Sequence, residues 1–157
     1  MEWGVITMEK LLSNTFQTLA KNKTANKMAK KHGLKFGAKR FVAGDSIEQA
    51  VACVRRLNEN GMVAMLNYLG EYVFTEEAAN EATRNCIRTL ESIHHSKIDC
   101  NLSVKITSLG LDISKELCIH NLKQILERAK AYGNFVRIEM EDYSHCQLTL
   151  DIYKELK

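Results

Sequence analysis

Proline is absent from this sequence of 157 residues, so glycine and helix-capping residues have to mark where its helices and strands end. No stretch approaches the roughly 18 consecutive apolar residues that a membrane-spanning helix needs. The N-terminus, MEWGVITMEKLL, also lacks the basic start and long apolar run of a secretory signal peptide. From these absences we expect a cytoplasmic protein without a transmembrane helix.

Closely spaced cysteines are missing as well. The five cysteines form no CxxC pair, which argues against both a disulfide framework and a zinc site, and small buried side chains are the simpler interpretation. The five histidines do not pair with one another, with cysteine or with a carboxylate at metal-binding spacing. We therefore expect no metal. The GxSxG motif of a serine nucleophile is also absent.

Charge divides the chain into two parts. Residues 1–44 hold nine lysines and arginines against Glu2 and Glu9, whereas residues 45–157 carry a net charge of −4. We expect the first part to be a basic helical segment and the second to be the main domain. The lysines could contact phosphates, but few aromatic residues lie among them, so we favour solvated surface helices and expect no nucleic-acid partner.

Within the main domain, helical and strand patterns alternate. The apolar runs 62–69, 103–109 and 135–141 predict strands. Ser46, Thr75, Ser114 and Ser144 each precede a stretch with helical periodicity and are typical helix N-caps. Such alternation predicts an α/β fold with parallel strands. An open doubly wound sheet and a closed (β/α)8 barrel both fit it, although the glycine motifs GxGxxG and GxxxxGK[ST] are absent.

Polar side chains gather where these predicted strands end, which is where parallel α/β folds bind ligands. Lys105 alternates with Val104 and Ile106 and should lie on the opposite face of its strand. A buried lysine without a partner is costly, so we expect Glu139 on the neighbouring strand to pair with it. The pair is either part of the scaffold or a cation aimed at an anionic ligand.

Four segments carry a resemblance to a known family: AKRFVAGDSIEQAV (38–51), NYLGEYVFTEEAA (67–79), SVKITSLGLDIS (103–114) and FVRIEMEDYSHCQLTLDIY (135–153). Together they resemble proline dehydrogenase of the single-function bacterial type. The resemblance implies a (β/α)8 barrel that holds FAD non-covalently and oxidises L-proline to Δ1-pyrroline-5-carboxylate. It also implies electron transfer to a membrane quinone, and hence a cytoplasmic enzyme that can be peripheral to the inner face of the membrane.

The same resemblance implies roles for single residues. Lys105 stands at the lysine that holds the proline carboxylate, and Glu139 stands at a catalytic aspartate. Met140 stands at a residue that contacts FAD through its backbone, and Asn67 replaces an aspartate of the first strand.

A (β/α)8 barrel takes about 250 residues, whereas the patterns predict only three strands after the N-terminal helices. We therefore expect the N-terminal part of such a barrel, from a truncated or split reading frame, inactive alone and with a complementing C-terminal chain as a candidate partner. The alternatives are a non-catalytic remnant and a small doubly wound α/β binding domain.

Overall fold

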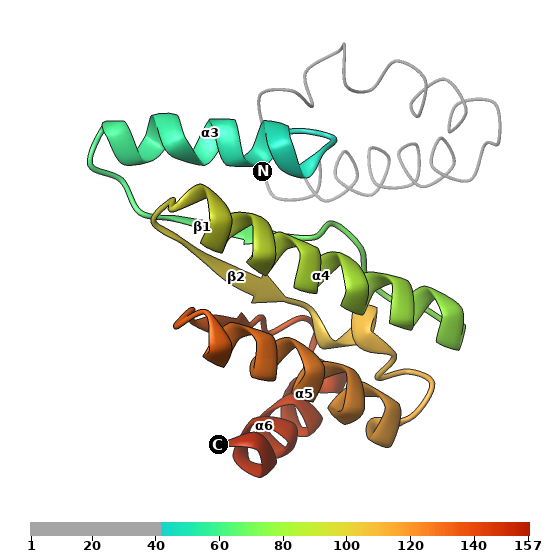
Figure 1. The fold of residues 1–157 in the computed structure, drawn as a ribbon. Helices are drawn as coiled ribbons and strands as arrows, with labels where there is room; N and C mark the ends of the chain where they lie inside the picture. The colour runs from blue at the N-terminus through green and yellow to red at the C-terminus, as the bar shows by residue number, and fades with distance from the viewer. Residues whose placement is uncertain (1–41) are drawn as a thin grey trace, which may run out of the picture. The chain divides into compact units, whose positions relative to one another are not determined.

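The computed structural model describes residues 42–157. The chain divides into the units Met1–Ala43 and Gly44–Lys157, and the basic helical segment predicted for residues 1–44 lies almost wholly outside the described residues. The elements of the second unit are α3 (Ile47–Glu59), β1 (Ala64–Asn67), α4 (Glu76–Ser96), β2 (Cys100–Val104), the 3-10 helix η2 (Ile106–Leu109), α5 (Lys115–Ala131), β3 (Val136–Ile138) and α6 (Tyr143–Leu156) (Figure 1).

The three strands form one parallel sheet in the order β1-β2-β3. Leu66 pairs in register with Leu102, and Leu102 with Val136. Helices connect successive strands, as parallel pairing requires. The predicted alternation of helices and parallel strands is therefore confirmed.

Side-chain caps begin the helices at or near the predicted places. Ser46, Thr75 and Ser114 each accept a hydrogen bond from a backbone N–H in the first turn of α3, α4 and α5. The prediction for α6 was wrong by two residues, because Asp142, not Ser144, is its N-cap. The hydroxyl of Ser144 instead donates to Asp142 Oδ1 at 2.5 Å, so Ser144 supports the cap from within the helix.

Strand β2 is shorter than the sequence predicted. It ends at Val104, and the chain turns at once into η2. The backbone N–H and hydroxyl of Ser108 both donate to the carbonyl of Lys105, at 3.1 and 2.6 Å. These bonds close a tight turn that a continuing strand could not form. Ile106 nevertheless remains fully buried.

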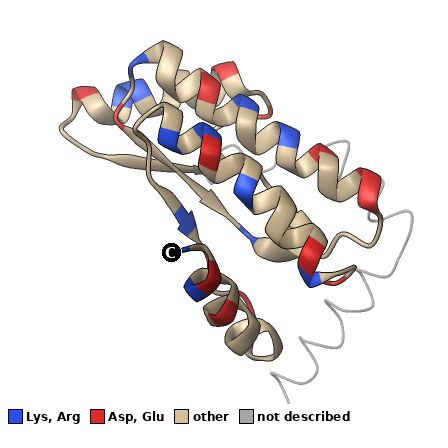
Figure 2. Cartoon of the chain, turned by 60° about the horizontal axis from the view of Figure 1, so that its bottom comes forward, with Lys and Arg blue, Asp and Glu red and all other residues tan. Residues whose placement is uncertain are grey.

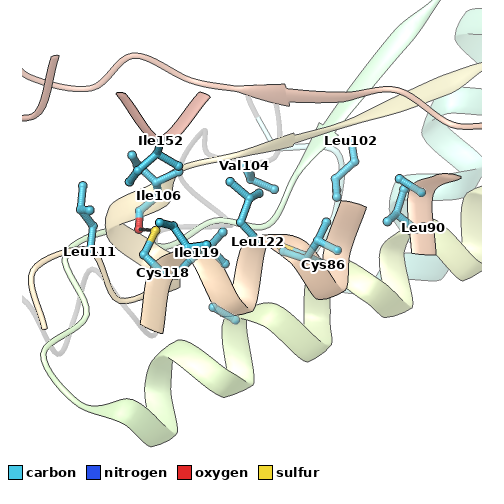
Figure 3. Close-up of a cluster of buried hydrophobic side chains, with 14 residues drawn as sticks. Cys86, Leu90, Leu102, Val104, Ile106, Leu111, Cys118, Ile119, Leu122 and Ile152 are labelled. Atoms are coloured by element: carbon cyan, nitrogen blue, oxygen red, sulfur yellow. Dashed lines mark hydrogen bonds between the residues drawn. The ribbon is translucent and has the colours of Figure 1, made fainter. Parts of the chain in front are cut away.

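The core lies between one face of the sheet and helices α4 and α5, which run side by side across it (Figure 1). Leu102 and Val104 of β2 point toward Cys86 and Leu90 of α4 and Leu122 of α5 (Figure 3). All five side chains are at most 3% exposed. From α6, Ile152 joins the same cluster.

The opposite face of the sheet is open among the described residues. Met65, Asn67 and Arg137 point to this side and are exposed, as barrel-interior positions would be in an isolated part of a barrel. Charges of both signs are mixed along the helices on the other side (Figure 2). Within residues 42–157, no helix combines the length and apolar character needed to cross a membrane.

Candidate active site

Polar side chains form a row across the open face of the sheet, near the carboxyl ends of the strands. Asn67 of β1 pairs in register with Ser103 of β2, and Ser103 with Arg137 of β3. The row continues past the strand ends, where Glu139 donates its backbone N–H to the carbonyl of Val104 at 2.9 Å. Lys105 follows Val104 directly, so the ammonium and the Glu139 carboxylate reach the same edge of the sheet.

Glu139 is held in place by two donors from the other strands. Its Oε1 accepts from the hydroxyl of Ser103 at 2.5 Å and from the amide Nδ2 of Asn67 at 2.7 Å. Hydrogen bonds to a carboxylate are stronger than those between neutral groups. Asn67 and Glu139 are therefore in direct contact.

Lys105 pairs with a different carboxylate from the predicted one. Its Nζ lies 2.5 Å from Glu71 Oε2 in the β1–α4 loop, whereas the two bonds of Glu139 go to Asn67 and Ser103. The expected Lys105–Glu139 bond was wrong because those two donors turn the Glu139 carboxylate toward β1. The predicted face was right, since Lys105 lies opposite the buried Val104 and Ile106.

The carboxylates around Lys105 stabilise its charged form. The hydrogen bond that Lys105 donates to Glu71 is the largest cause, and the charges of Glu71, Glu139 and Glu141 add to it, so the pKa of the Lys105 ammonium is raised above its usual value. The Lys105 side chain is still 27% exposed and that of Glu71 is 50% exposed. The ammonium is thus charged and accessible from the open face.

Thr107 in η2 connects the loops around this edge. Its backbone N–H and hydroxyl donate to the two carboxylate oxygens of Glu141, at 3.1 and 2.6 Å. The Thr107 hydroxyl oxygen accepts from the backbone N–H of Tyr72 at 3.2 Å, and its carbonyl accepts from that of Val73 at 3.3 Å. Residues that follow all three strands are thereby joined through one threonine.

A second network joins the same three loops. The ring nitrogens of His145 lie 2.9 Å from Asp112 Oδ1 and 2.9 Å from Asp142 Oδ1, and the hydroxyl of Tyr72 donates to Asp142 Oδ2 at 2.8 Å. Sequence reasoning missed these four residues as a group. The available signal was the spacing of Asp142 and His145, which places the histidine at the third position of a helix that the aspartate caps.

Met140, the residue expected to contact a flavin, follows Glu139 just beyond β3. Its side chain is 52% exposed, in contrast to Ile138, which packs against the core. It therefore lies at the accessible edge of the sheet.

The described domain is an α/β protein with a parallel sheet, and its accessible cation flanked by carboxylates lies at the carboxyl ends of the strands, where barrels and doubly wound folds generally bind ligands. Comparison with known proteins identifies the family. The family model described as proline dehydrogenase matches residues 50–157. The chain belongs to the proline dehydrogenase family.

Characterised relatives agree with this assignment. The chain is 47% identical over 147 residues to "Proline dehydrogenase 1" of Bacillus subtilis subsp. natto, a match that covers 94% of this chain and 49% of the relative. It is 33% identical over 122 residues to "Proline dehydrogenase" of Deinococcus radiodurans, covering 76% of this chain and 39% of the relative. The chain thus spans about half the length, or less, of these relatives.

A solved structure resembles the fold. Proline utilization A (PutA) from Bdellovibrio bacteriovorus, in a crystal structure of the protein inactivated by N-propargylglycine, matches with a TM-score of 0.72 at 24% identity. The match covers 82% of this chain and 16% of that chain. This likeness concerns the fold, and it favours part of a (β/α)8 barrel over a doubly wound sheet.

Proposed function

We propose that residues 45–157 form the first three βα units of an FAD-dependent proline dehydrogenase barrel, which oxidises L-proline to Δ1-pyrroline-5-carboxylate. The observation that carries this proposal is the ammonium of Lys105, which lies at the carboxyl ends of the strands beside Glu71 and Glu139. A carboxylate substrate needs such a cation, and its amine needs a carboxylate nearby.

The proline carboxylate would bind to the ammonium of Lys105 in place of the Glu71 carboxylate. The Lys105–Glu71 pair is partly exposed, and exposed ion pairs contribute only about 0–1 kcal/mol. An incoming carboxylate can therefore displace Glu71 at small cost. In a closed barrel the new contact would be a charge-assisted hydrogen bond, which contributes about 1.5–3 kcal/mol.

Glu139 would be the catalytic carboxylate that contacts the substrate amine. Both of its described side-chain bonds go to Oε1, so Oε2 is available to a donor on the substrate. Because Asn67 and Ser103 hold the other oxygen, the carboxylate is oriented before the substrate arrives, and preorganisation of this kind is what a catalytic group requires.

FAD would contribute the acceptor for the hydride that leaves proline. Of the residues named here, Met140 is the candidate contact for it, because this residue is exposed at the same edge of the sheet as Glu139. The described residues supply only part of an FAD site. The remaining strands of the barrel have to come from other sequence, in the same polypeptide or in a complementing chain. We further propose a quinone at the inner face of the membrane as the final electron acceptor.

The first test compares the chain alone with a completed barrel. We expect the purified 157-residue chain to show no proline-dependent dye reduction, because it supplies only part of the flavin pocket. A chimera would replace the matching 147 residues of Bacillus proline dehydrogenase 1 with those of this chain. We expect this chimera to bind FAD and to reduce the dye with proline, and a folded, flavin-loaded but inactive chimera would favour a non-catalytic remnant.

The second test concerns Lys105 in that chimera. Lys105→Met should raise the KM for proline about 10- to 150-fold, which corresponds to the loss of about 1.5–3 kcal/mol, and should leave FAD binding nearly unchanged. The matched control is Lys123→Met on the exposed side of α5, which should alter neither. Unchanged proline kinetics in folded Lys105→Met would assign Lys105 to the scaffold.

A further inference from the structure

His145 has a carboxylate at each of its two ring nitrogens. Nε2 lies 2.9 Å from Asp112 Oδ1, in the loop between η2 and α5, and Nδ1 lies 2.9 Å from Asp142 Oδ1, at the cap of α6. The side chain is only 16% exposed. The hydroxyl oxygen of Ser144 lies 3.2 Å from Nδ1, and the ring of Tyr72 lies 6.2 Å from the imidazole, centroid to centroid.

This geometry determines the protonation state of the ring. An ionised carboxylate can only accept hydrogen bonds, and a neutral imidazole has a single N–H. Both contacts can therefore be hydrogen bonds only when His145 is an imidazolium. Consistent with this, Asp112 first and Asp142 second raise the pKa of His145 above its usual value.

Asp142 connects His145 to the β1–α4 loop. Its Oδ2 accepts from the Tyr72 hydroxyl at 2.8 Å, and this bond raises the pKa of that hydroxyl to about 12. Tyr72 has a φ of 53°, a left-handed conformation that is unfavourable for a residue with a side chain. The bonds of its hydroxyl to Asp142 and of its N–H to Thr107 hold it there.

We propose that His145 is a positioning residue: as an imidazolium between Asp112 and Asp142 it fixes Asp142, which holds Tyr72 and so sets the conformation of the β1–α4 loop. Glu71 precedes Tyr72 directly and pairs with Lys105. The histidine therefore acts on the candidate substrate-binding lysine through a tyrosine and a glutamate, without lying at the open face itself.

Two consequences follow. The loop is ordered while His145 is protonated and loosens when the ring loses its proton, because a lone pair then faces a carboxylate. The relevance of this order to substrate binding rests on the proposed function, since it assumes that Lys105 receives the proline carboxylate. The ordering itself does not depend on that assumption, and it can be measured on the 157-residue chain without activity.

The first measurement is an NMR titration of the histidine rings in the intact chain. We expect His145 to titrate above the usual histidine value of about 6.5 and to carry a proton on both ring nitrogens below that pH. Asp112→Asn should lower the titration point of His145 while keeping the contact with Asp142. A titration point of His145 at or below about 6.5 would overturn the proposal.

The second measurement follows the backbone N–H groups of Tyr72 and Val73 by hydrogen exchange. In His145→Gln we expect exchange at these two sites to become about tenfold faster relative to the intrinsic rate, the equivalent of about 1.4 kcal/mol. His120→Gln should leave them unchanged.

In the wild-type chain the same protection should fall as the pH rises through the titration of His145. A merely structural histidine would not produce this pH profile, and protection that stays constant across the His145 titration would contradict a positioning role. Because neither measurement involves proline or FAD, failure of the proposed function would not change their outcome.

Discussion

The side chains of Asn67 and Glu139 form a hydrogen-bonded pair. The Asn67 amide donates to Glu139 Oε1 at 2.7 Å, a contact that two carboxylates could form only by sharing a proton. At residue 67 the amide is therefore matched to the carboxylate at residue 139.

The hydrogen bond between Asn67 and Glu139 predicts the effect of a charge at residue 67. Asn67→Asp should lower the free energy of unfolding by about 2 kcal/mol at neutral pH, because it removes a hydrogen bond to a charged group and adds repulsion. Asn67→Asp combined with Glu139→Gln restores a donor and an acceptor and should recover most of the loss. Urea denaturation of the unaltered chain and the two variants measures both effects, and a double variant no more stable than Asn67→Asp would refute the coupling.

The Lys105–Glu71 pair should behave differently. Because the pair is partly exposed, Glu71→Gln should change the free energy of unfolding by less than about 1 kcal/mol. It should also lower the pKa of Lys105, since the bond to Glu71 is the first cause of its elevation. NMR titration of the lysine Nζ checks the second effect, and a pKa unaffected by the substitution would mean that the pair does not form in solution.

At the scale of elements, α5 holds the sheet through its buried stripe. Leu122 is fully buried in the main cluster, so Leu122→Ala should destabilise the chain by about 2–5 kcal/mol. The matched control, Leu150→Ala on α6, truncates a side chain that is 40% exposed and should cost much less. Equal losses in urea denaturation would show that α5 does not pack as described.

The helices could be predicted from sequence because their signals are local. Ser46, Thr75 and Ser114 cap the helices that they were expected to cap, and Gly61 and Gly133, just past α3 and α5, have the positive φ that is typical of a glycine at a helix end. Strand ends were less predictable. The end of β2 depends on Ser108 competing for a carbonyl, which the apolar pattern does not reveal.

The sequence predicted on which face of the sheet the candidate site lies, but not which side chains pair with each other there. Strand alternation places Lys105 on the open side of the sheet, as expected. The choice of Glu71 over Glu139 depends on where Asn67 and Ser103 lie in register, which is long-range information. His145 was overlooked for the same reason, since Asp112 lies 33 positions away in the sequence.

At the scale of the whole molecule, the two networks predict how stability depends on pH. The folded pKa of His145 is raised above its unfolded value of about 6.5, so its contribution is complete below about pH 6.5 and is lost as the pH rises through the folded pKa. Donors from Ser144, His145 and Tyr72 lower the pKa of Asp142. The contribution of Asp142 is therefore present above about pH 4 and is lost as the pH falls through its folded pKa.

Stability should accordingly be greatest between about pH 4 and pH 6.5 and should fall as the pH rises from there through the raised pKa of His145. Urea denaturation across the pH range tests this expectation. His145→Gln should flatten the alkaline decline, while His120→Gln should not, and an alkaline decline that persists unchanged in His145→Gln would assign it to other groups.

The form of β3 has a consequence for self-association. This strand is one of the two edge strands of the described sheet, it has only three residues, and its central residue, Arg137, is exposed. Exposed strand edges are templates for pairing with further copies, and short length and a central charge are devices that discourage it. If two copies met antiparallel along β3 and centred on Arg137, their guanidinium groups would face each other and repel. A strand with an acidic residue at that point would instead be attracted, so the edge discriminates between a second copy of itself and a complementary strand.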